Sequence, residues 1–262
     1  MLHMVLQEVS SSKCFGGQQK VYKHESYTVN CAMKFSVYLP PTYDTLANLP
    51  VVFFLQGLTC TEQNFIIKSG AQRTAARLGL ILVSPDTSPR GCNIPGEDDS
   101  YDFGSGAGFY VNATQGPWSA HYHIMGGHGA LIVGLREADR FVSVSAFAPI
   151  CHSSVSPWGI KAFTGELAFI CYLGADADWS MYDAVELIIK HKKRFARTPL
   201  IDQGDQDEWL EKQLMPSDLE KVCAAVGQDL TLRYQKGYDH SYFFISTFME
   251  DHLNFHAKNL SE

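Results

Sequence analysis

An aspartate and a histidine in the last quarter of the chain are placed for acid–base chemistry. Asp207 lies in a loop after the predicted strand 198–201, and His240 follows the next predicted strand, 230–234. A histidine in such a loop can act as general base and then general acid, while a carboxylate holds its imidazole in the required tautomer. The alternative is that both side chains only cap loops, and their spacing favours neither interpretation.

The nucleophile that such a pair would activate is missing from its expected place. The stretch from His121 reads HYHIMGGHGAL, and its second half resembles the run that follows the serine of a G-x-S-x-G turn. Aligned on Gly126, the first glycine is replaced by Tyr122 and the serine by Ile124. Isoleucine cannot attack a carbonyl, and a β-branched residue is unsuited to the positive φ of such a turn. No nucleophile is therefore assigned.

Other hydroxyls and backbone groups remain candidates for parts of a site. Ser119 and Ser241 could each replace the missing serine, but neither lies on such a turn, so a role in a cap or loop is favoured. Gly57 follows the predicted strand 49–55. The N–H groups after this glycine could form half of an oxyanion hole, although a glycine after a strand is a weak signal.

A metal site is an alternative source of hydrolytic chemistry. Three histidines lie within eight positions, and three aspartates lie in a preceding loop: His121, His123 and His128, with Asp98, Asp99 and Asp102. Zinc ligands normally stand at regular spacings on defined elements, and these residues do not. Surface histidines are the favoured interpretation, so no metal is predicted.

Apolar runs that alternate with helical patterns indicate an α/β fold. The predicted strands are 34–39, 49–55, 80–84, 142–147, 198–201 and 230–234, and the predicted helices are 64–78, 127–138, 182–193, 216–226 and 242–257. This alternation predicts a mostly parallel sheet with helices on both faces. No repeat or linker divides the chain, so residues 1–262 are predicted to form a single domain. The tract 85–108 is a long loop of the kind that is usually functional.

One interval interrupts the alternation. Between the predicted strands 80–84 and 142–147 the sequence contains long loops and one helix, but no strand. A further helix and strand would normally lead into the helix at 127. The sheet is therefore predicted to lack one central strand.

Composition narrows the class of protein. The chain has 262 residues, 45% of them hydrophobic, and a net charge of −7, which excludes a nucleic-acid partner because phosphate binding needs clustered Lys and Arg. No apolar run is long enough to cross a bilayer, and the first residues do not form a signal peptide. Seven cysteines without a CxxC pair indicate reduced thiols and a cytoplasmic protein.

Several long motifs together resemble the S-formylglutathione hydrolase family, also called the esterase D family. They cover nearly the whole chain and are specific to that family. The matching runs are 13–17 (KCFGG), 55–65 (LQGLTCTEQNF), 84–94 (SPDTSPRGCNI), 106–111 (GAGFYV), 125–131 (MGGHGAL), 143–151 (SVSAFAPIC), 157–159 (PWG) and 237–242 (GYDHSY).

This resemblance implies an α/β-hydrolase fold, no cofactor and a possible homodimer. It implies a serine esterase and thioesterase that releases formate from S-formylglutathione in formaldehyde detoxification. His240 would be the general base and Asp207 its orienting acid, and the N–H groups of Leu58 and Met125 would form the oxyanion hole. Cys60 would lie beside the site, unless it is only a small apolar filler.

The sequence departs from the family at the nucleophile. Members of the family have G-H-S-M-G-G-H-G-A, preceded by a helix and a central strand, whereas roughly thirty residues are missing here, the size of the helix-plus-strand part of a βαβ unit. A few apolar residues are also added within 165–172. Altered exon choice or an imperfect gene model is the hypothesis for both changes, which a genome without the missing coding segment would rule out.

Two consequences are predicted from this departure. The chain lacks its serine and is expected to be inactive alone, the alternative function being that of a catalytically dead isoform that acts as a binding module. A missing strand leaves unpaired backbone groups, each costing about 1–3 kcal/mol, against a total stability of roughly 5–15 kcal/mol. Low solubility or partial unfolding is therefore expected.

Overall fold

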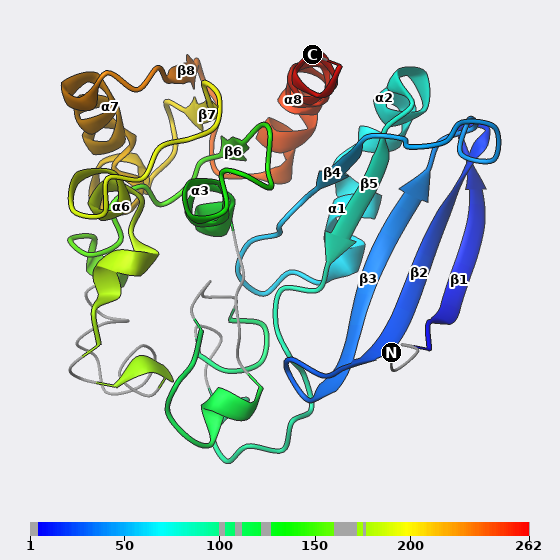
Figure 1. Cartoon of the computed structure of the whole chain (residues 1–262), viewed down its shortest axis with the longest axis horizontal. Helices are drawn as coiled ribbons and strands as arrows, with labels where there is room; N and C mark the ends of the chain where they lie inside the picture. The colour runs from blue at the N-terminus through cyan, green and yellow to red at the C-terminus, as the bar shows by residue number, and fades with distance from the viewer. Residues whose placement is uncertain are drawn as a thin grey trace.

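The described strands form two separate sheets. The computed structural model describes residues 5–99, 103–107, 112–121, 127–159, 172–174 and 177–261. The first sheet has the order β1-β2-β3-β5-β4 and the second the order β6-β7-β8. In Figure 1 the two sheets lie on opposite sides of the molecule. The added apolar residues of 165–171 lie outside the described residues.

The first sheet is mostly antiparallel. It contains β1 (Gln7–Cys14), β2 (Gly17–Ser26), β3 (Cys31–Leu39), β5 (Ile81–Pro85) and β4 (Val51–Phe53), and only β4 and β5 are parallel. The sequence analysis missed β1 and β2. Most of β1 is exposed on both faces and reads QEVSSSKC, so it lacks the alternating apolar pattern on which strand prediction depends.

The second sheet is parallel and is covered on both faces. It contains β6 (Ser145–Phe147), β7 (Leu200–Gly204) and β8 (Thr231–Gln235). One face packs against α3 (Gly127–Arg136), α6 (Ala184–Ile189) and α7 (Pro216–Val226). On the other face lies α8 (Tyr242–Leu260), where the ring of Phe147 stacks on His252 with centroids 3.7 Å apart.

The predicted helix 64–78 is two helices, so that prediction was wrong. The helices α1 (Glu62–Lys68) and α2 (Ala71–Leu78) are separated at Gly70, whose φ is +66°. Glycine adopts this left-handed conformation without the steric cost that a Cβ brings. The apolar period continues across the break, so it did not reveal the change of direction. None of the helices within the described ranges is long and apolar enough to span a bilayer.

The inner edges of the two sheets are not joined to each other. Within the described ranges, β4 pairs only with β5, and β6 pairs only with β7. The strand that the sequence lacks would lie between them, because one further strand would make a continuous sheet. We call this space the strand slot.

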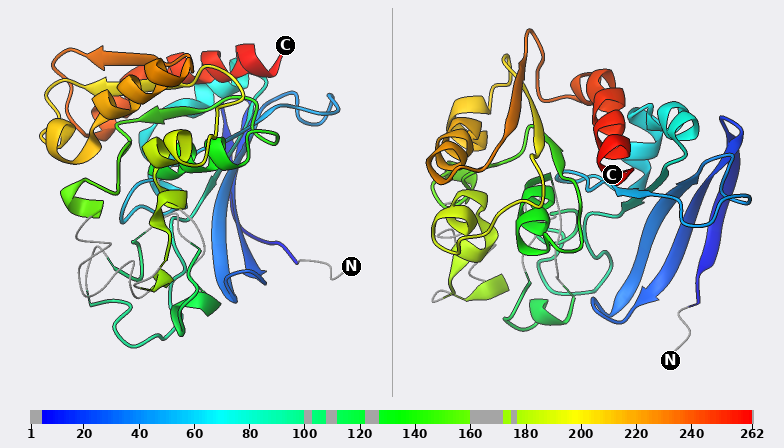
Figure 2. Two further views of the ribbon diagram at one scale, coloured as in Figure 1. Left: turned by 60° about the vertical axis from the view of Figure 1, so that its left-hand side comes forward. Right: turned by 45° about the horizontal axis from the view of Figure 1, so that its top comes forward.

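The helix α8 connects the two sheets on one side of the strand slot. Its residues Met249 and Leu253 are buried in the same cluster as Leu82 of β5 and Leu80, which directly precedes that strand. Its residue His252 contacts the second sheet. Figures 1 and 2 show α8 between the β6–β8 sheet and the helices α1 and α2.

A buried polar network fixes α8 to the second sheet. His252 Nε2 lies 3.1 Å from Asp202 Oδ2, and His252 Nδ1 lies 2.8 Å from Ser145 Oγ. His256 Nε2 lies 2.9 Å from the same hydroxyl. Arg233 donates to both oxygens of the Asp202 carboxylate. Such a network stabilises the fold only while every member keeps its partner and its charge state.

The charge states of this network follow from burial and pairing. Burial alone would raise the pKa of Asp202, but hydrogen bonds from His252 and Arg233 outweigh it and lower that pKa to about 2. Burial lowers the pKa of His256 to about 3, and that of His252 also lies below its usual value. Asp202 is therefore ionised and His256 neutral at pH 7.

We predict that the chain loses stability between pH 7 and pH 4. In the unfolded chain His256 binds a proton near its ordinary pKa of 6.5, whereas the folded chain resists protonation until about pH 3. The folded state is therefore disfavoured as the pH falls below 6.5, by about 3 kcal/mol at pH 4. Asp202 contributes little to this loss of stability. The stability that its lowered pKa provides is lost only as the pH falls below 3.8, the ordinary pKa of the carboxyl in the unfolded chain. Urea unfolding of the parent and His256→Gln at both pH values measures this, and equal pH dependence in both would contradict it.

We also predict that truncation of the apolar face of α8 is costly. Leu253→Ala removes buried contacts with the first sheet and should lower the free energy of unfolding by about 2–5 kcal/mol. The matched change Glu250→Ala removes only an exposed ion pair with Arg77 and should cost less than about 1 kcal/mol. Denaturant unfolding followed by circular dichroism compares the two, and similar losses would argue against α8 as the connecting element.

Candidate active site

The structure brings Asp207 and His240 together. Asp207 follows β7, and His240 stands between β8 and α8; Nδ1 of the histidine lies 2.7 Å from Oδ2 of the aspartate. The aspartate side chain is fully buried, whereas that of His240 is 44% exposed. This leaves Nε2 as the ring nitrogen available to a reacting proton. The arrangement is that of an orienting acid and a general base.

A glycine makes this approach possible. The two loops are tied by the Gln206 N–H, which donates to the Tyr238 carbonyl at 2.9 Å, and by the Gly237 N–H, which donates to Asp205 Oδ1 at 2.7 Å. A Cβ at Gly204 would lie only 2.3 Å from the Tyr238 carbonyl oxygen. Any side chain at this position would push the loop that carries Asp207 away from the loop that carries His240.

The Asp207 carboxylate is held at both oxygens. Oδ1 accepts the Trp209 N–H at 2.9 Å, and Oδ2 accepts Gln203 Nε2 at 3.0 Å in addition to His240. Burial raises the pKa of Asp207, but these hydrogen bonds outweigh it and hold the pKa below its usual value. The carboxylate is therefore ionised and able to stabilise a protonated His240. Sequence reasoning missed Gln203, because nothing in the spacing of the chain marks a supporting amide.

The loop after β4 presents a free backbone donor. Thr59, at φ +64°, donates its N–H to the Gly106 carbonyl at 2.8 Å, and the Cys60 N–H donates to the Gly57 carbonyl at 3.2 Å. Leu58 has no acceptor for its N–H within the part of the chain that the structure describes. Its N–H is thus available to an oxyanion. Met125, the other predicted donor, and Ile124, in the serine position, lie outside the described residues.

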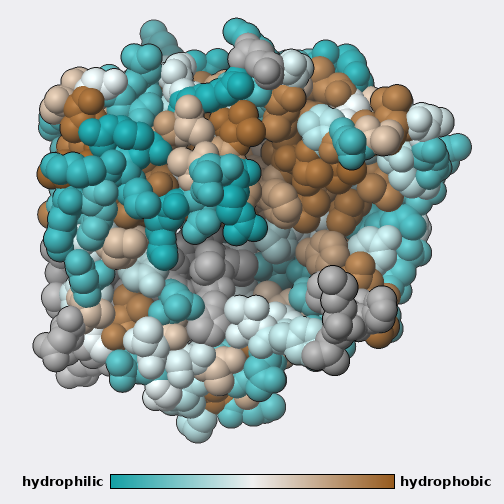
Figure 3. Space-filling view, viewed as in Figure 1, coloured by the Kyte–Doolittle hydropathy of each residue, from teal (hydrophilic) through white to brown (hydrophobic). Residues whose placement is uncertain are grey.

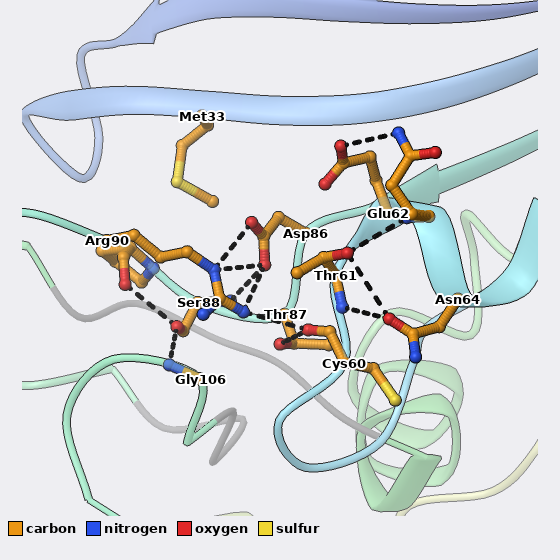
Figure 4. Close-up of polar contacts among 12 residues, drawn as sticks. Met33, Cys60, Thr61, Glu62, Asn64, Asp86, Thr87, Ser88, Arg90 and Gly106 are labelled. Atoms are coloured by element: carbon orange, nitrogen blue, oxygen red, sulfur yellow. Dashed lines mark hydrogen bonds and ion pairs between the residues drawn. The ribbon is translucent and has the colours of Figure 1, made fainter. Parts of the chain in front are cut away.

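Side chains from the long loop hold the Cys60 carbonyl (Figure 4). Thr87 Oγ1 donates to it, and Arg90 Nη2 donates to it at 3.1 Å. Arg90 in turn pairs with the buried Asp86, with Nε 3.0 Å from Oδ2. The loop of Cys60 is therefore fixed by an ion pair from outside it. The sequence analysis treated this tract only as a functional loop.

The same loop leads directly into α1. Thr61 caps the helix by accepting the Gln63 N–H, and its own N–H donates to Asn64 Oδ1 at 2.9 Å. Burial raises the pKa of the Cys60 thiol. A thiol with a raised pKa is a weak nucleophile at neutral pH, which gives no support for Cys60 as a replacement for the missing serine.

The remaining candidate residues have structural contacts. Ser241 is the N-cap of α8; it accepts the Phe243 N–H and donates to Asp239 at 2.6 Å. Ser119 lies in the short 3-10 turn Trp118–Ala120. Each ring nitrogen of His128 lies within 2.8 Å of a backbone carbonyl oxygen. His123 and Asp102 lie outside the described residues, and among the described residues no three possible metal ligands come together.

Comparison with known proteins places the chain among esterases. A family model described as "Putative esterase" matches residues 26–124 and 123–255. The two matched pieces meet at residues 123 and 124, where the sequence lacks its central strand. The chain is 47% identical to the S-formylglutathione hydrolase of Rattus norvegicus, with 98% of this chain and all of the relative aligned. It is 48% identical to that of Arabidopsis thaliana, with 97% of this chain and 98% of the relative aligned.

The arrangement of the elements also matches solved structures. An S-formylglutathione hydrolase from Agrobacterium tumefaciens superposes with a TM-score of 0.90 at 42% identity, over 97% of this chain and 99% of that one. A fluorophosphonate-binding serine hydrolase of Staphylococcus aureus shares the fold at a TM-score of 0.68 and 14% identity, over 92% of this chain and 98% of that one. The predicted fold class is therefore confirmed.

We predict that Arg90→Gln loosens the loop of Cys60. The change removes a charged hydrogen bond to the Cys60 carbonyl, so local opening of the loop should become about tenfold more frequent. The rate of Cys60 alkylation by iodoacetamide, followed by peptide mass spectrometry, measures that opening. Arg77→Gln, which breaks only exposed contacts with Glu250 and Asn254, is the matched control. An unchanged rate in Arg90→Gln would show that Thr87 alone holds the loop.

Proposed function

Because this chain belongs to the S-formylglutathione hydrolase family, we propose that its site hydrolyses the thioester S-formylglutathione to formate and glutathione. The observation that carries the proposal is the 2.7 Å hydrogen bond between the buried Asp207 carboxylate and the partly exposed imidazole of His240. A carboxylate that orients a reachable imidazole is the acid–base half of a serine esterase. The substrate is a small molecule, and simple esters are included in the proposal.

In the proposed reaction His240 moves a proton twice. First, Nε2 takes the proton of the serine hydroxyl while the oxygen attacks the formyl carbonyl, and it gives that proton to the departing glutathione sulfur. Water then attacks the formyl ester, Nε2 takes the proton of the water, and it returns a proton to the serine as formate leaves. Asp207 stays ionised throughout and stabilises the imidazolium at each step.

The oxyanion of both tetrahedral intermediates needs donors beside the reacting carbon. We assign this role to the backbone N–H groups of Leu58 and Met125. The free N–H of Leu58 and the rigid loop that presents it support the assignment. Such donors are effective because they are fixed before charge develops. Cys60 is two residues from Leu58, so modification of its thiol should disturb the hole without removing a reacting group.

The serine itself belongs to the segment that this chain lacks. The alignment with the Rattus norvegicus relative spans 289 positions, more than the 262 residues of this chain, so the relative has residues without a counterpart here. With Ile124 in the serine position, the 262-residue chain retains the base and acid without the nucleophile. The alternative of a binding module gains no support, since the relatives are themselves named as hydrolases.

Two further features are part of the proposal. A cytoplasmic location is supported by the six described cysteines, all of which are free thiols. A homodimer is proposed from the resemblance to the family, and light scattering of the purified chain tests it.

We predict a large difference between this chain and a version with the missing segment of the Rattus norvegicus relative restored. The restored version should hydrolyse S-formylglutathione, and the 262-residue chain should be about a million-fold slower, the effect of losing a triad serine. Release of glutathione thiol measures both rates.

We also predict that Asp207→Asn in the restored version reduces kcat by about 10⁴-fold, since the imidazole then takes the wrong tautomer.

Comparable turnover by the unmodified chain would overturn the proposal as stated. In that case Ser119→Ala and Ser241→Ala in the unmodified chain would show whether either hydroxyl acts as the nucleophile. A restored chain that folds but does not turn over S-formylglutathione would overturn the substrate.

A further inference from the structure

The two edges of the strand slot carry backbone groups that face a position where the described residues place no strand. Along β4, the Phe54 N–H donates to the Val83 carbonyl, and the Pro50 carbonyl accepts the Ile81 N–H, so residues 50, 52 and 54 point to β5. In a strand the backbone groups of alternate residues point to opposite sides. Those of Val51 and Phe53 therefore point into the slot.

The edge of β6 has the same pattern. The Ala148 N–H donates to the Asp202 carbonyl, and the Val144 carbonyl accepts the Leu200 N–H, so residues 144, 146 and 148 point to β7. The backbone groups of Ser145 and Phe147 then point to the slot. Each edge thus offers two residues whose N–H and C=O groups have no strand partner within the described ranges.

The side chains at the slot are apolar and exposed. Val51 is 39% and Phe53 54% exposed, although their strand, β4, is the edge of the first sheet that faces the second sheet (Figure 1). Figure 3 shows hydrophobic residues gathered over β4 and β5. An apolar strand edge that is left open is a site for pairing with another strand.

The overall arrangement of the two sheets matches that of a solved relative. The chain superposes on the Agrobacterium tumefaciens enzyme with a TM-score of 0.90 over 97% of its length, which a collapse of one sheet onto the other would lower. The edges have not moved together to pair with each other. The rings of Phe53 and Phe141 meet edge-on, with centroids 6.4 Å apart, so side chains rather than backbone groups span the space there.

We propose that the strand slot binds one extended segment supplied by a separate polypeptide, and that this segment is the strand and turn that the relatives contain and this chain lacks. The 262-residue chain is then the acceptor half of a two-piece hydrolase. The inserted strand would be short and continuously apolar, since both of its faces become buried. Binding does not depend on the proposed function, whereas recovery of activity rests on it.

A second copy of this chain does not fit the slot. The slot has two facing edges, so its occupant must form hydrogen bonds on both sides. Every strand in the described part of this chain already has at least one partner. A strand from a second copy would have to leave its own sheet, whereas a free peptide brings two unpaired edges and breaks no pairing.

The test uses the full chain and a synthetic peptide with the residues of the Rattus norvegicus relative that are missing here, ending in the Gly-His-Ser turn. Titration calorimetry measures binding, and thermal unfolding measures the gain in stability. We expect saturable one-to-one binding and a rise of several degrees in the unfolding midpoint. A peptide with proline in the middle of its strand should bind roughly tenfold more weakly or worse, because it loses a ladder hydrogen bond.

A matched pair of chain variants locates the site. Phe53→Lys places a charge on the edge of the slot and should abolish binding, whereas Tyr27→Lys, at another exposed aromatic residue between β2 and β3, should leave binding unchanged. If the chain alone is insoluble, co-expression with the peptide fused to a carrier protein replaces the titration. Co-purification that the proline and Phe53→Lys changes abolish then supports the proposal.

Activity separates the two proposals. Binding with hydrolysis of S-formylglutathione that is lost in the serine-to-alanine peptide supports both. Binding without hydrolysis supports the strand slot and overturns the proposed function. If the peptide neither binds nor co-purifies, the strand-slot proposal is overturned and the proposed function stands. The same holds if the peptide binds but Phe53→Lys does not change the binding.

Discussion

The attachment of α8 to both sheets is the constraint on which the rest of this structure depends. Since β4 and β6 share no hydrogen bonds, the halves of the fold are held by side chains: Leu253 and Met249 on one side, and the Asp202–His252 contact on the other. The same helix begins directly after His240. Burial in the core therefore also fixes the position of the general base, and the site exists only while α8 stays docked.

The acid–base pair is complete without its nucleophile because its support is local. Asp207 is held by the Trp209 N–H and by Gln203, both within four residues of it in the chain. The loop that carries Leu58 is held by Arg90 and Asp86, from the first half of the chain. Neither support passes through the missing segment. Loss of a strand thus removes one reacting group, while Asp207, His240 and Leu58 keep the contacts that position them.

Much of this arrangement could be predicted from the sequence, wherever a local sequence pattern is itself the reason for the structure. The apolar run of β5, the proline-started α7 and the order of Asp207 before His240 are such patterns. β1 was missed because its residues are polar on both faces and its pairing depends on β2. The contacts of Gln203 and Arg90 could not be predicted, since they join residues whose proximity only the folded chain creates. The split of the sheet could be predicted from an absent strand, but not the role of α8 in bridging it.

Gly204 limits the substitutions that this protein can accept next to its acid–base pair. It has no atom that could take part in acid–base chemistry, yet its missing Cβ is what lets the loops of Asp207 and His240 approach each other. A substitution there would act on the reaction through shape alone. Substitution at Gly204 is thus as restricted as at the reacting side chains, but for a different reason: Asp207 and His240 are needed for their functional groups, and Gly204 for the space that its missing side chain leaves to the Tyr238 carbonyl.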